Sequence, residues 1–289
     1  MGEKEKGLDL VITTSDEMLM VCIQSNPATI SLLSEKTLPA RPISIGQYQG
    51  CIYATLSNGT VAKVNQNYDI EESYMEFPDL VQCATIYNDK IYMLIWKSLH
   101  LGYEVRVYDI INRNEIHRFI HRCLQRGNSL LTAVSDQIVI VDPPSHLTVY
   151  SLSGQPVSYL NCLKIDPHRI SICPCYDDSI IITEYDSYCV SRIIIKTGKR
   201  VWRCRPNCSS FIVGATCFAK EYVLVASSYR NTFIVLDVQT GRYINEIPVA
   251  AVGNTYGIVN IFCVKKTIIL TNSGFQLDKL FVCQINTTD

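Results

Sequence analysis

The chain contains 289 residues, with 26 Lys and Arg against 27 Asp and Glu, so its formal net charge is −1. Hydrophobic residues make up 47% of it and charged residues only 18%. A chain with so many apolar and so few charged residues buries much of its surface. This composition excludes disordered, collagen-like and low-complexity proteins. The near-neutral charge also disfavours a protein whose whole surface binds nucleic acid or an anionic membrane.

Short runs of β-branched and aromatic residues recur along the chain, with almost no helical periodicity. The most apolar kind of run occurs seven times, at residues 18–23, 51–56, 90–95, 137–141, 179–183, 222–226 and 267–271. Successive runs start 33 to 47 residues apart, as the starts at 18, 51, 90 and 137 show. This spacing is typical of a four-stranded propeller blade.

A strand precedes most of these runs, and a hairpin of two further strands follows them. The preceding strands are predicted at residues 42–48, 81–87, 130–134, 169–173, 212–218 and 257–263. In the clearest hairpin, residues 232–238 and 242–247 flank a turn whose Gly241 supplies a positive φ. A small sheet with two apolar faces cannot cover itself, so these four-stranded units predict an all-β chain closed into a ring.

The number of blades stays open between seven and six. Seven runs favour a closed seven-bladed propeller, whereas one irregular unit would leave six blades. The last unit stops after its third strand, at residues 280–285. Ring closure must then come from packing, or from an N-terminal run that pairs into the last sheet.

Two of the hairpins carry a turn pattern found in known repeats. Residues Lys196–Trp202 read Lys-Thr-Gly-Lys-Arg-Val-Trp, and residues Asp237–Arg242 read Asp-Val-Gln-Thr-Gly-Arg. With this pattern and the repeat, the chain resembles the seven-bladed β-propeller superfamily, which includes WD-repeat and quinoprotein-like propellers. One unit has the Trp, and none ends in Trp-Asp. The resemblance implies a repeat protein that acts as a scaffold for protein–protein interaction.

Residues 1–7 are polar and lack the apolar core of a secretory signal. No apolar run approaches the roughly 18 residues that a membrane-spanning helix needs. We therefore expect a polar tail over residues 1–7 and a single propeller domain over residues 8–289. The same features predict a cytoplasmic or nuclear protein without a membrane partner, and they leave the oligomeric state open.

The thirteen cysteines lie mostly inside apolar runs, where a reduced cysteine behaves as a small hydrophobic residue. Three groups have the spacing of paired zinc ligands: His117, His121 and Cys123; Cys173 and Cys175; Cys204 and Cys208. A structural zinc site needs two such pairs to converge. Because the three groups fall in different predicted blades, we expect reduced core thiols and no metal ligands.

The predicted innermost strands carry small neutral residues and no Asp or Glu, as residues 43–47 and 213–217 illustrate. A metal or cofactor in the central channel would need oxygen ligands there. The chain also lacks a Gly-x-Ser-x-Gly motif and a phosphate-binding glycine loop. We therefore predict no catalytic residue, no cofactor and no metal.

Surface recognition is the function that remains. In a propeller, the loops from second to third strand and from fourth strand to the next blade share one face. The residues expected on that face are His121, Arg122, Arg126, Pro167, His168, Arg205, Asn207, Tyr229, Arg230 and Asn231. Arg and Tyr provide large, orientable contacts at binding sites. The candidate partner-binding residues are Arg122, Arg126, His168, Arg205, Tyr229 and Arg230.

These residues predict a non-catalytic module that docks a protein partner on a loop face. Their basic character suits an acidic peptide motif. Two alternatives stay open: a propeller enzyme with a channel-bound cofactor or metal, and a propeller that binds RNA. RNA binding is disfavoured by the neutral net charge and would show an affinity that falls steeply with salt.

Overall fold

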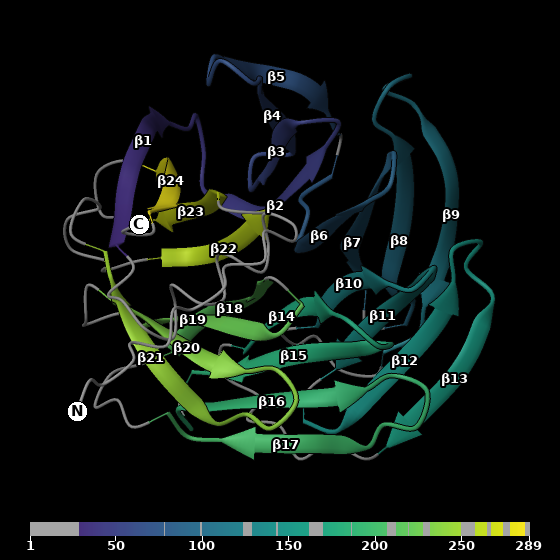
Figure 1. Ribbon diagram of the computed structural model, residues 1–289. Helices are drawn as coiled ribbons and strands as arrows, with labels where there is room; N and C mark the ends of the chain where they lie inside the picture. Colours follow the sequence, from purple (N-terminus) through teal and green to yellow (C-terminus); the bar gives the residue numbers. More distant parts are fainter. Residues whose placement is uncertain are drawn as a thin grey trace, which may run out of the picture.

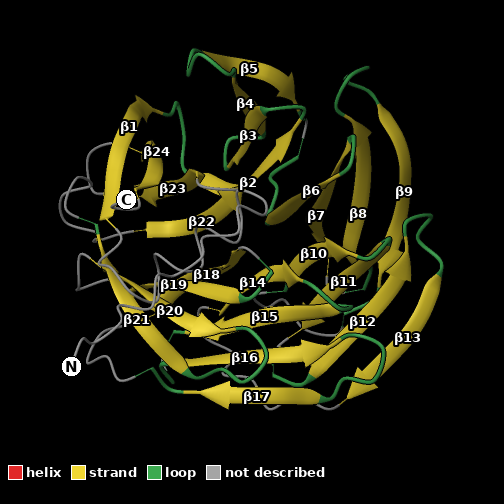
Figure 2. Cartoon of the chain, viewed as in Figure 1, coloured by secondary structure: helices red, strands yellow, loops and turns green. Residues whose placement is uncertain are grey.

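The structure is a computed structural model. It describes residues 29–77, 79–98, 100–123, 129–142, 144–161, 170–185, 187–206, 212–218, 220–227, 232–249, 258–264, 267–273 and 278–286. Over these ranges the chain is all β and contains no helix (Figure 2). It therefore has no helix there that could span a membrane.

The strands form six four-stranded antiparallel sheets, the blades, which follow one another round a ring (Figure 1). Blade 1 contains β2 (Pro42–Tyr48), β3 (Cys51–Leu56), β4 (Thr60–Val64) and β5 (Ile70–Glu76). Blade 2 contains β6 (Cys83–Tyr87), β7 (Lys90–Ser98), β8 (Gly102–Asp109) and β9 (Glu115–His121). Blade 3 contains β10 (Leu130–Val134), β11 (Gln137–Asp142), β12 (His146–Ser151) and β13 (Pro156–Asn161).

The second half of the ring repeats this plan. Blade 4 contains β14 (Ile170–Cys175), β15 (Ser179–Glu184), β16 (Cys189–Ile194) and β17 (Arg200–Cys204). Blade 5 contains β18 (Ile212–Phe218), β19 (Tyr222–Ser227), β20 (Thr232–Asp237) and β21 (Tyr243–Pro248). Blade 6 contains β22 (Ile258–Val264), β23 (Thr267–Ser273), β24 (Asp278–Asn286) and, as its outermost strand, β1 (Thr29–Thr37).

The predicted propeller of four-stranded antiparallel blades is confirmed, with six blades, the smaller of the two numbers that the sequence allowed. Three innermost strands, β2, β10 and β18, have the predicted bounds. Six of the seven apolar runs become the second strands β3, β7, β11, β15, β19 and β23. The seventh run, residues 18–23, lies outside the described residues, as do the predicted tail 1–7 and the first part of the predicted domain, residues 8–28.

The second strands are apolar on both faces because each is packed between neighbouring blades. All six residues of β15 and all six of β19 are buried. At the boundary of blades 4 and 5, for example, Ile181 and Val190 pack with Val223 and Val225 in one hydrophobic cluster. Burial of these faces on both sides holds the ring together, since burying one large aliphatic side chain contributes roughly 1.5–3 kcal/mol.

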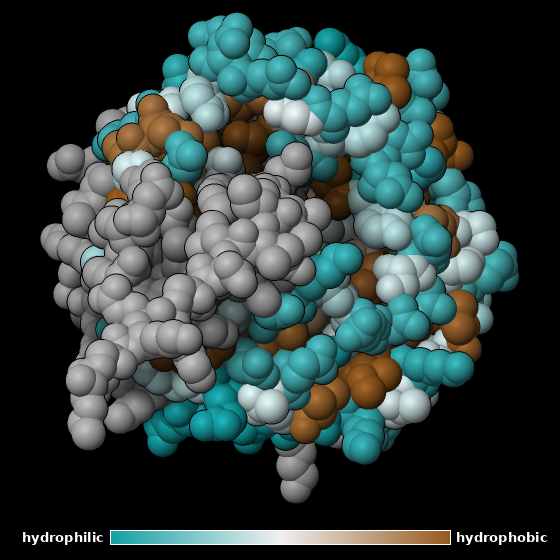
Figure 3. Space-filling model, in the orientation of Figure 1, coloured by the Kyte–Doolittle hydropathy of each residue, from teal (hydrophilic) through white to brown (hydrophobic). Residues whose placement is uncertain are grey.

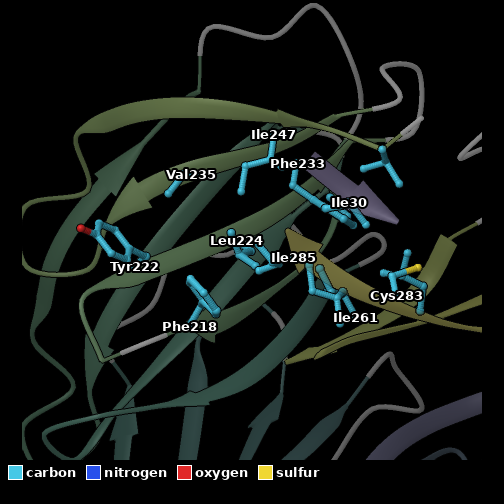
Figure 4. Close-up of a cluster of buried hydrophobic side chains, with 14 of the residues drawn as sticks. Ile30, Phe218, Tyr222, Leu224, Phe233, Val235, Ile247, Ile261, Cys283 and Ile285 are labelled. Carbon is cyan, nitrogen blue, oxygen red and sulfur yellow. The ribbon is translucent and has the colours of Figure 1, made fainter. Parts of the chain in front are cut away.

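The ring is closed by β1, which pairs antiparallel with β24 from Thr29↔Asn286 to Thr37↔Lys279. Closure therefore uses an N-terminal strand in the last sheet, one of the two solutions that the sequence left open. Ile30 of β1 is buried with Phe233 and Ile247 of blade 5 (Figure 4). An ion pair between Glu35 and Lys279 lies along the same strand pair. The strand β1 therefore completes the sixth blade and does not belong to a seventh one.

Candidate functional site

Two of the candidate partner-binding residues lie on the loop face within the described chain. Arg122 follows β9 directly, Arg205 follows β17 directly, and both side chains are exposed. The other four, Arg126, His168, Tyr229 and Arg230, lie outside the described residues, together with Pro167, Asn207 and Asn231. The two described candidates therefore lie at the ends of blades 2 and 4.

Arg205 is the best-defined cation on this face. Its guanidinium carbon lies 5.2 Å from the centroid of the Tyr188 ring, in the loop that joins β15 to β16. The neighbouring Arg203 instead pairs with the buried carboxylate of Glu184, at 3.0 Å. No carboxylate among the described residues pairs with Arg205. The Tyr188 ring thus orients an exposed guanidinium whose donors can meet an incoming acceptor.

His121, which the sequence places on the loop face, is instead buried, with 1% of its surface exposed. Its Nε2 lies 2.7 Å from Asp142 Oδ2, and its Nδ1 lies 2.8 Å from the Tyr150 hydroxyl. The Ser129 hydroxyl donates to the other carboxylate oxygen of Asp142, at 2.5 Å. A neutral ring satisfies both contacts when Nε2–H donates to Asp142 and Tyr150 donates to Nδ1. His121 therefore joins blade 2 to blade 3.

Ser129, His121 and Asp142 are the three residue types of a hydrolytic triad, but their order is wrong for one. In a triad the histidine lies between the nucleophile and the acid. Here Asp142 lies between Ser129 and His121, and all three side chains are buried. Burial, and then the nearby charge of Asp142, raise the pKa of Tyr150 to about 12. The group is suited to holding two blades together.

A second polar cluster joins the loop before blade 2 to the third strand of that blade. Arg106 of β8 donates from Nε to Glu104 Oε2 at 2.8 Å, and its Nη2 lies 2.7 Å from Asp79 Oδ2. Lys97 of β7 lies 3.2 Å from the same Glu104 oxygen. Burial alone would raise the pKa of Glu104, but hydrogen bonds from Arg106 and Lys97 outweigh it, so that pKa lies below its ordinary value. The cluster is neutralised internally.

This cluster predicts an acid-sensitive contribution to stability. Folding lowers the pKa of the Glu104 carboxylate below its ordinary value of 4.5. Such a carboxylate contributes its full stabilisation at a pH above the pKa of the unfolded state. The contribution is lost as the pH falls through the pKa of the folded state. Glu104→Gln is expected to cost about 2 kcal/mol at pH 7 and to flatten the fall in stability below pH 4.5. Urea denaturation at several pH values checks this. If the free energy of unfolding falls equally steeply with pH in wild type and variant, the prediction is wrong. The control is Glu72→Gln, at an exposed glutamate of β5.

Within the described residues, the groups with the spacing of zinc ligands do not converge. His117 and His121 lie on the same face of β9, as alternation predicts, but Phe119 lies between them and stacks on His117. Cys173 and Cys175 meet Cys217 of blade 5, and Cys208 lies outside the described residues. Within the described ranges, no three His, Cys, Asp or Glu side chains are arranged to hold a metal ion. The ten cysteines of these ranges are thiols.

Exposed hydrophobic side chains are concentrated on the outermost strands. The examples are Ile116 and Ile120 of β9, Val157 and Tyr159 of β13, and Tyr243 of β21. On the face drawn in Figure 3, hydrophobic residues are mostly divided into small groups by hydrophilic ones. Hydrophobic residues scattered in this way are ordinary for a protein surface and do not mark a binding site.

No protein-family model matches the chain, and no curated protein matches it. Among solved structures, 1402 chains match, which shows how widely the fold is shared. One of them is a catalytically inactive variant of virginiamycin B lyase from Staphylococcus aureus with quinupristin, with a TM-score of 0.61 and 15% sequence identity. The match covers 89% of this chain and 100% of that chain. At this identity the likeness shows the propeller fold alone.

Proposed function

We propose that the chain is a non-catalytic binding module that docks an acidic peptide segment of a protein partner on its loop face. The observation that carries the proposal is the exposed Arg205 guanidinium held over the Tyr188 ring. The ring limits the side-chain motion that binding would otherwise have to suppress. Arg can donate two parallel hydrogen bonds to one carboxylate, so a Glu or Asp side chain is the matching ligand.

The other polar groups are bonded to one another, which supports a binding role over a catalytic one. Ser129, His121 and Asp142 are buried and bonded to one another in an order that leaves the serine without its base. The charged groups around Glu104 and Arg106 satisfy one another. Exposed cations of the described loop face include Arg122, Arg205 and Arg41, in the loop from β1 to β2, and such side chains are suited to recognition.

Arg205→Ala is expected to weaken binding of acidic peptides about tenfold, the effect of losing roughly 1.4 kcal/mol. The measurement is fluorescence polarisation with labelled peptides taken from an array of Asp- and Glu-containing sequences, against the full chain. Arg122→Ala is expected to weaken binding of the same peptides less, because no aromatic ring among the described residues lies beneath the Arg122 guanidinium. The dependence of the peptide affinity on salt concentration is measured in parallel.

The matched control is Arg113→Ala. Arg113 also lies over a tyrosine, with its guanidinium carbon 4.0 Å from the Tyr74 ring centroid. It belongs to the turn between β8 and β9, which the alternating strand directions place on the opposite face of the ring. Equal weakening by Arg113→Ala and Arg205→Ala would mean general charge attraction and reject the loop-face site. Tighter binding of a single-stranded RNA oligonucleotide would favour the RNA alternative.

A further inference from the structure

Three thiols meet at the boundary between blades 4 and 5. Cys173 and Cys175 lie two residues apart in β14 and therefore project from the same face of that strand. Cys217 lies in β18, the innermost strand of the next blade, and its thiol hydrogen-bonds with both. Cys173 and Cys175 are buried in the cluster between the two blades, and Cys217 packs against it while partly exposed. Neither the ring closure nor the loop face uses these sulfur atoms.

A buried cation stands beside this group. Arg192 of β16 has 4% of its surface exposed, and its Nε donates to the Ser179 hydroxyl at 2.9 Å. Its Nη1 donates to the Val238 carbonyl of blade 5 at 3.1 Å. The Ser179 hydroxyl in turn contacts the Cys175 sulfur. The guanidinium, which also pairs with the exposed Asp177 carboxylate at 3.5 Å, is thus fixed near Cys175, where its positive charge favours the thiolate.

These surroundings distinguish Cys175 from the other buried thiols. The hydrogen bond with Cys217, opposed by burial and assisted by Ser179 and Arg192, lowers the pKa of Cys175 below that of an ordinary thiol. The contacts with Cys173 and Cys175 raise the pKa of Cys217. Burial raises the pKa of Cys83 to about 11 and that of Cys283 to about 12. The boundary therefore places a thiol of lowered pKa beside a thiol of raised pKa.

We propose that Cys175 and Cys217 are a peroxide-oxidisable pair that forms a disulfide between blades 4 and 5. The geometry that supports it is the packing of Cys175 and Cys217, from the neighbouring innermost strands β14 and β18, in one cluster beside a fixed guanidinium. The disulfide would join covalently two blades that otherwise meet by packing. The site is independent of the loop-face function, so failure of either proposal leaves the other standing.

The reaction balances with hydrogen peroxide as the oxidant. The Cys175 thiolate attacks one peroxide oxygen, the O–O bond breaks, and a sulfenic acid and hydroxide form. The Cys217 sulfur then attacks the Cys175 sulfur, the S–O bond breaks, and the oxygen leaves as water with the Cys217 proton. The proton that Cys175 lost on ionisation neutralises the hydroxide. Two thiols and one peroxide thus become one disulfide and two waters.

A metal site is the competing use of clustered thiols. The described residues do not favour a metal site, because no three potential ligands among them are arranged to hold a metal ion. Metal analysis of the purified, reduced chain is therefore part of the test. One equivalent of bound zinc or copper that is lost in Cys175→Ser would overturn the proposal.

The decisive experiment maps disulfides in the full-length chain after brief treatment with equimolar hydrogen peroxide. Free thiols are alkylated under denaturing conditions, and the digest is analysed without reduction by mass spectrometry, with fragmentation to locate the linked sulfurs. The expected result is a Cys175–Cys217 link as the main product. It should disappear in Cys175→Ser and in Cys217→Ser.

Two variants serve as controls. Cys83→Ser removes a buried thiol of blade 2 and should leave the link unchanged, as should Cys173→Ser. Absence of any link in the wild type, a main link through Cys173, or equal oxidation of all thiols would reject the proposal. Circular dichroism first establishes that each variant folds. If a variant at Cys175 or Cys217 does not fold, the wild-type linkage map decides alone, because it identifies the bonded sulfurs directly.

Discussion

Ile30→Asp is expected to open the ring and cause the largest loss of stability of the changes considered. Ile30 has 3% of its surface exposed and lies in β1 against Phe233 and Ile247 of blade 5 and Ile285 of β24. The change removes roughly 2 kcal/mol of apolar burial and places a carboxylate where it has no partner, for a further cost of several kcal/mol. That sum approaches the whole stability of many domains, about 5–15 kcal/mol. Urea denaturation and limited proteolysis measure the loss.

The same strand supplies the control for this prediction. Leu33 is 42% exposed beside the irregularity in β1 pairing at Leu32 and Ser34. Leu33→Asp therefore introduces the same charge at almost no burial cost, and we expect a change within about 0.5 kcal/mol. If both variants lose stability equally, β1 is sensitive to charge along its whole length and the specific packing of Ile30 does not close the ring.

His121→Ala is expected to lower the free energy of unfolding by about 3 kcal/mol. It removes two hydrogen bonds between blades 2 and 3 and leaves the buried Asp142 carboxylate with Ser129 as its remaining side-chain partner. Its measurement is urea denaturation near neutral pH. A catalytic histidine would show little effect on stability, so a large loss also supports the structural role of the group.

Two further variants sharpen this test. His117→Ala removes an exposed histidine from the same face of β9 and is expected to change stability by less than about 1 kcal/mol. Tyr150→Phe removes one of the two bonds to His121. Because both residues belong to one network, the loss in the double variant should be smaller than the sum of the single losses. Additive losses would mean that the two side chains stabilise the ring separately.

The blades could be predicted from the sequence because their second strands are packed on both faces. That packing makes the middle of β15, residues 180–182, and most of β19 apolar, and such runs stand out at a regular spacing. The number of blades could not be predicted in the same way. The strand β1 mixes polar and apolar residues, and its partner β24 lies at the far end of the sequence. Nothing local in residues 29–37 indicates that they complete the last sheet.

The candidate site was predictable only in part, because burial of a side chain depends on distant partners. Arg205 was correctly placed on the loop face, since its position follows from the end of a strand. His121 was misplaced because Asp142 and Tyr150, which bury it, come from the next blade. A signal was present: Asp142 is a charged residue that ends the apolar run of β11. The contact between Cys175 and Cys217 was not predicted, because the predicted innermost strand ended at residue 173, whereas β14 continues to Cys175.

Closure of the ring by β1 has a consequence for the order of folding. Thr29 pairs with Asn286, which is 257 residues later (286 − 29). At a synthesis rate of roughly 5–20 residues per second, β1 emerges on the order of 10 to 50 seconds before its partner strand exists. Blades 1 to 5 can pack in that interval as an open arc, with Ile30 and the blade 5 residues that cover it still facing water. The final step of folding is then a search between distant segments, and that interval is when the nascent chain most needs a chaperone.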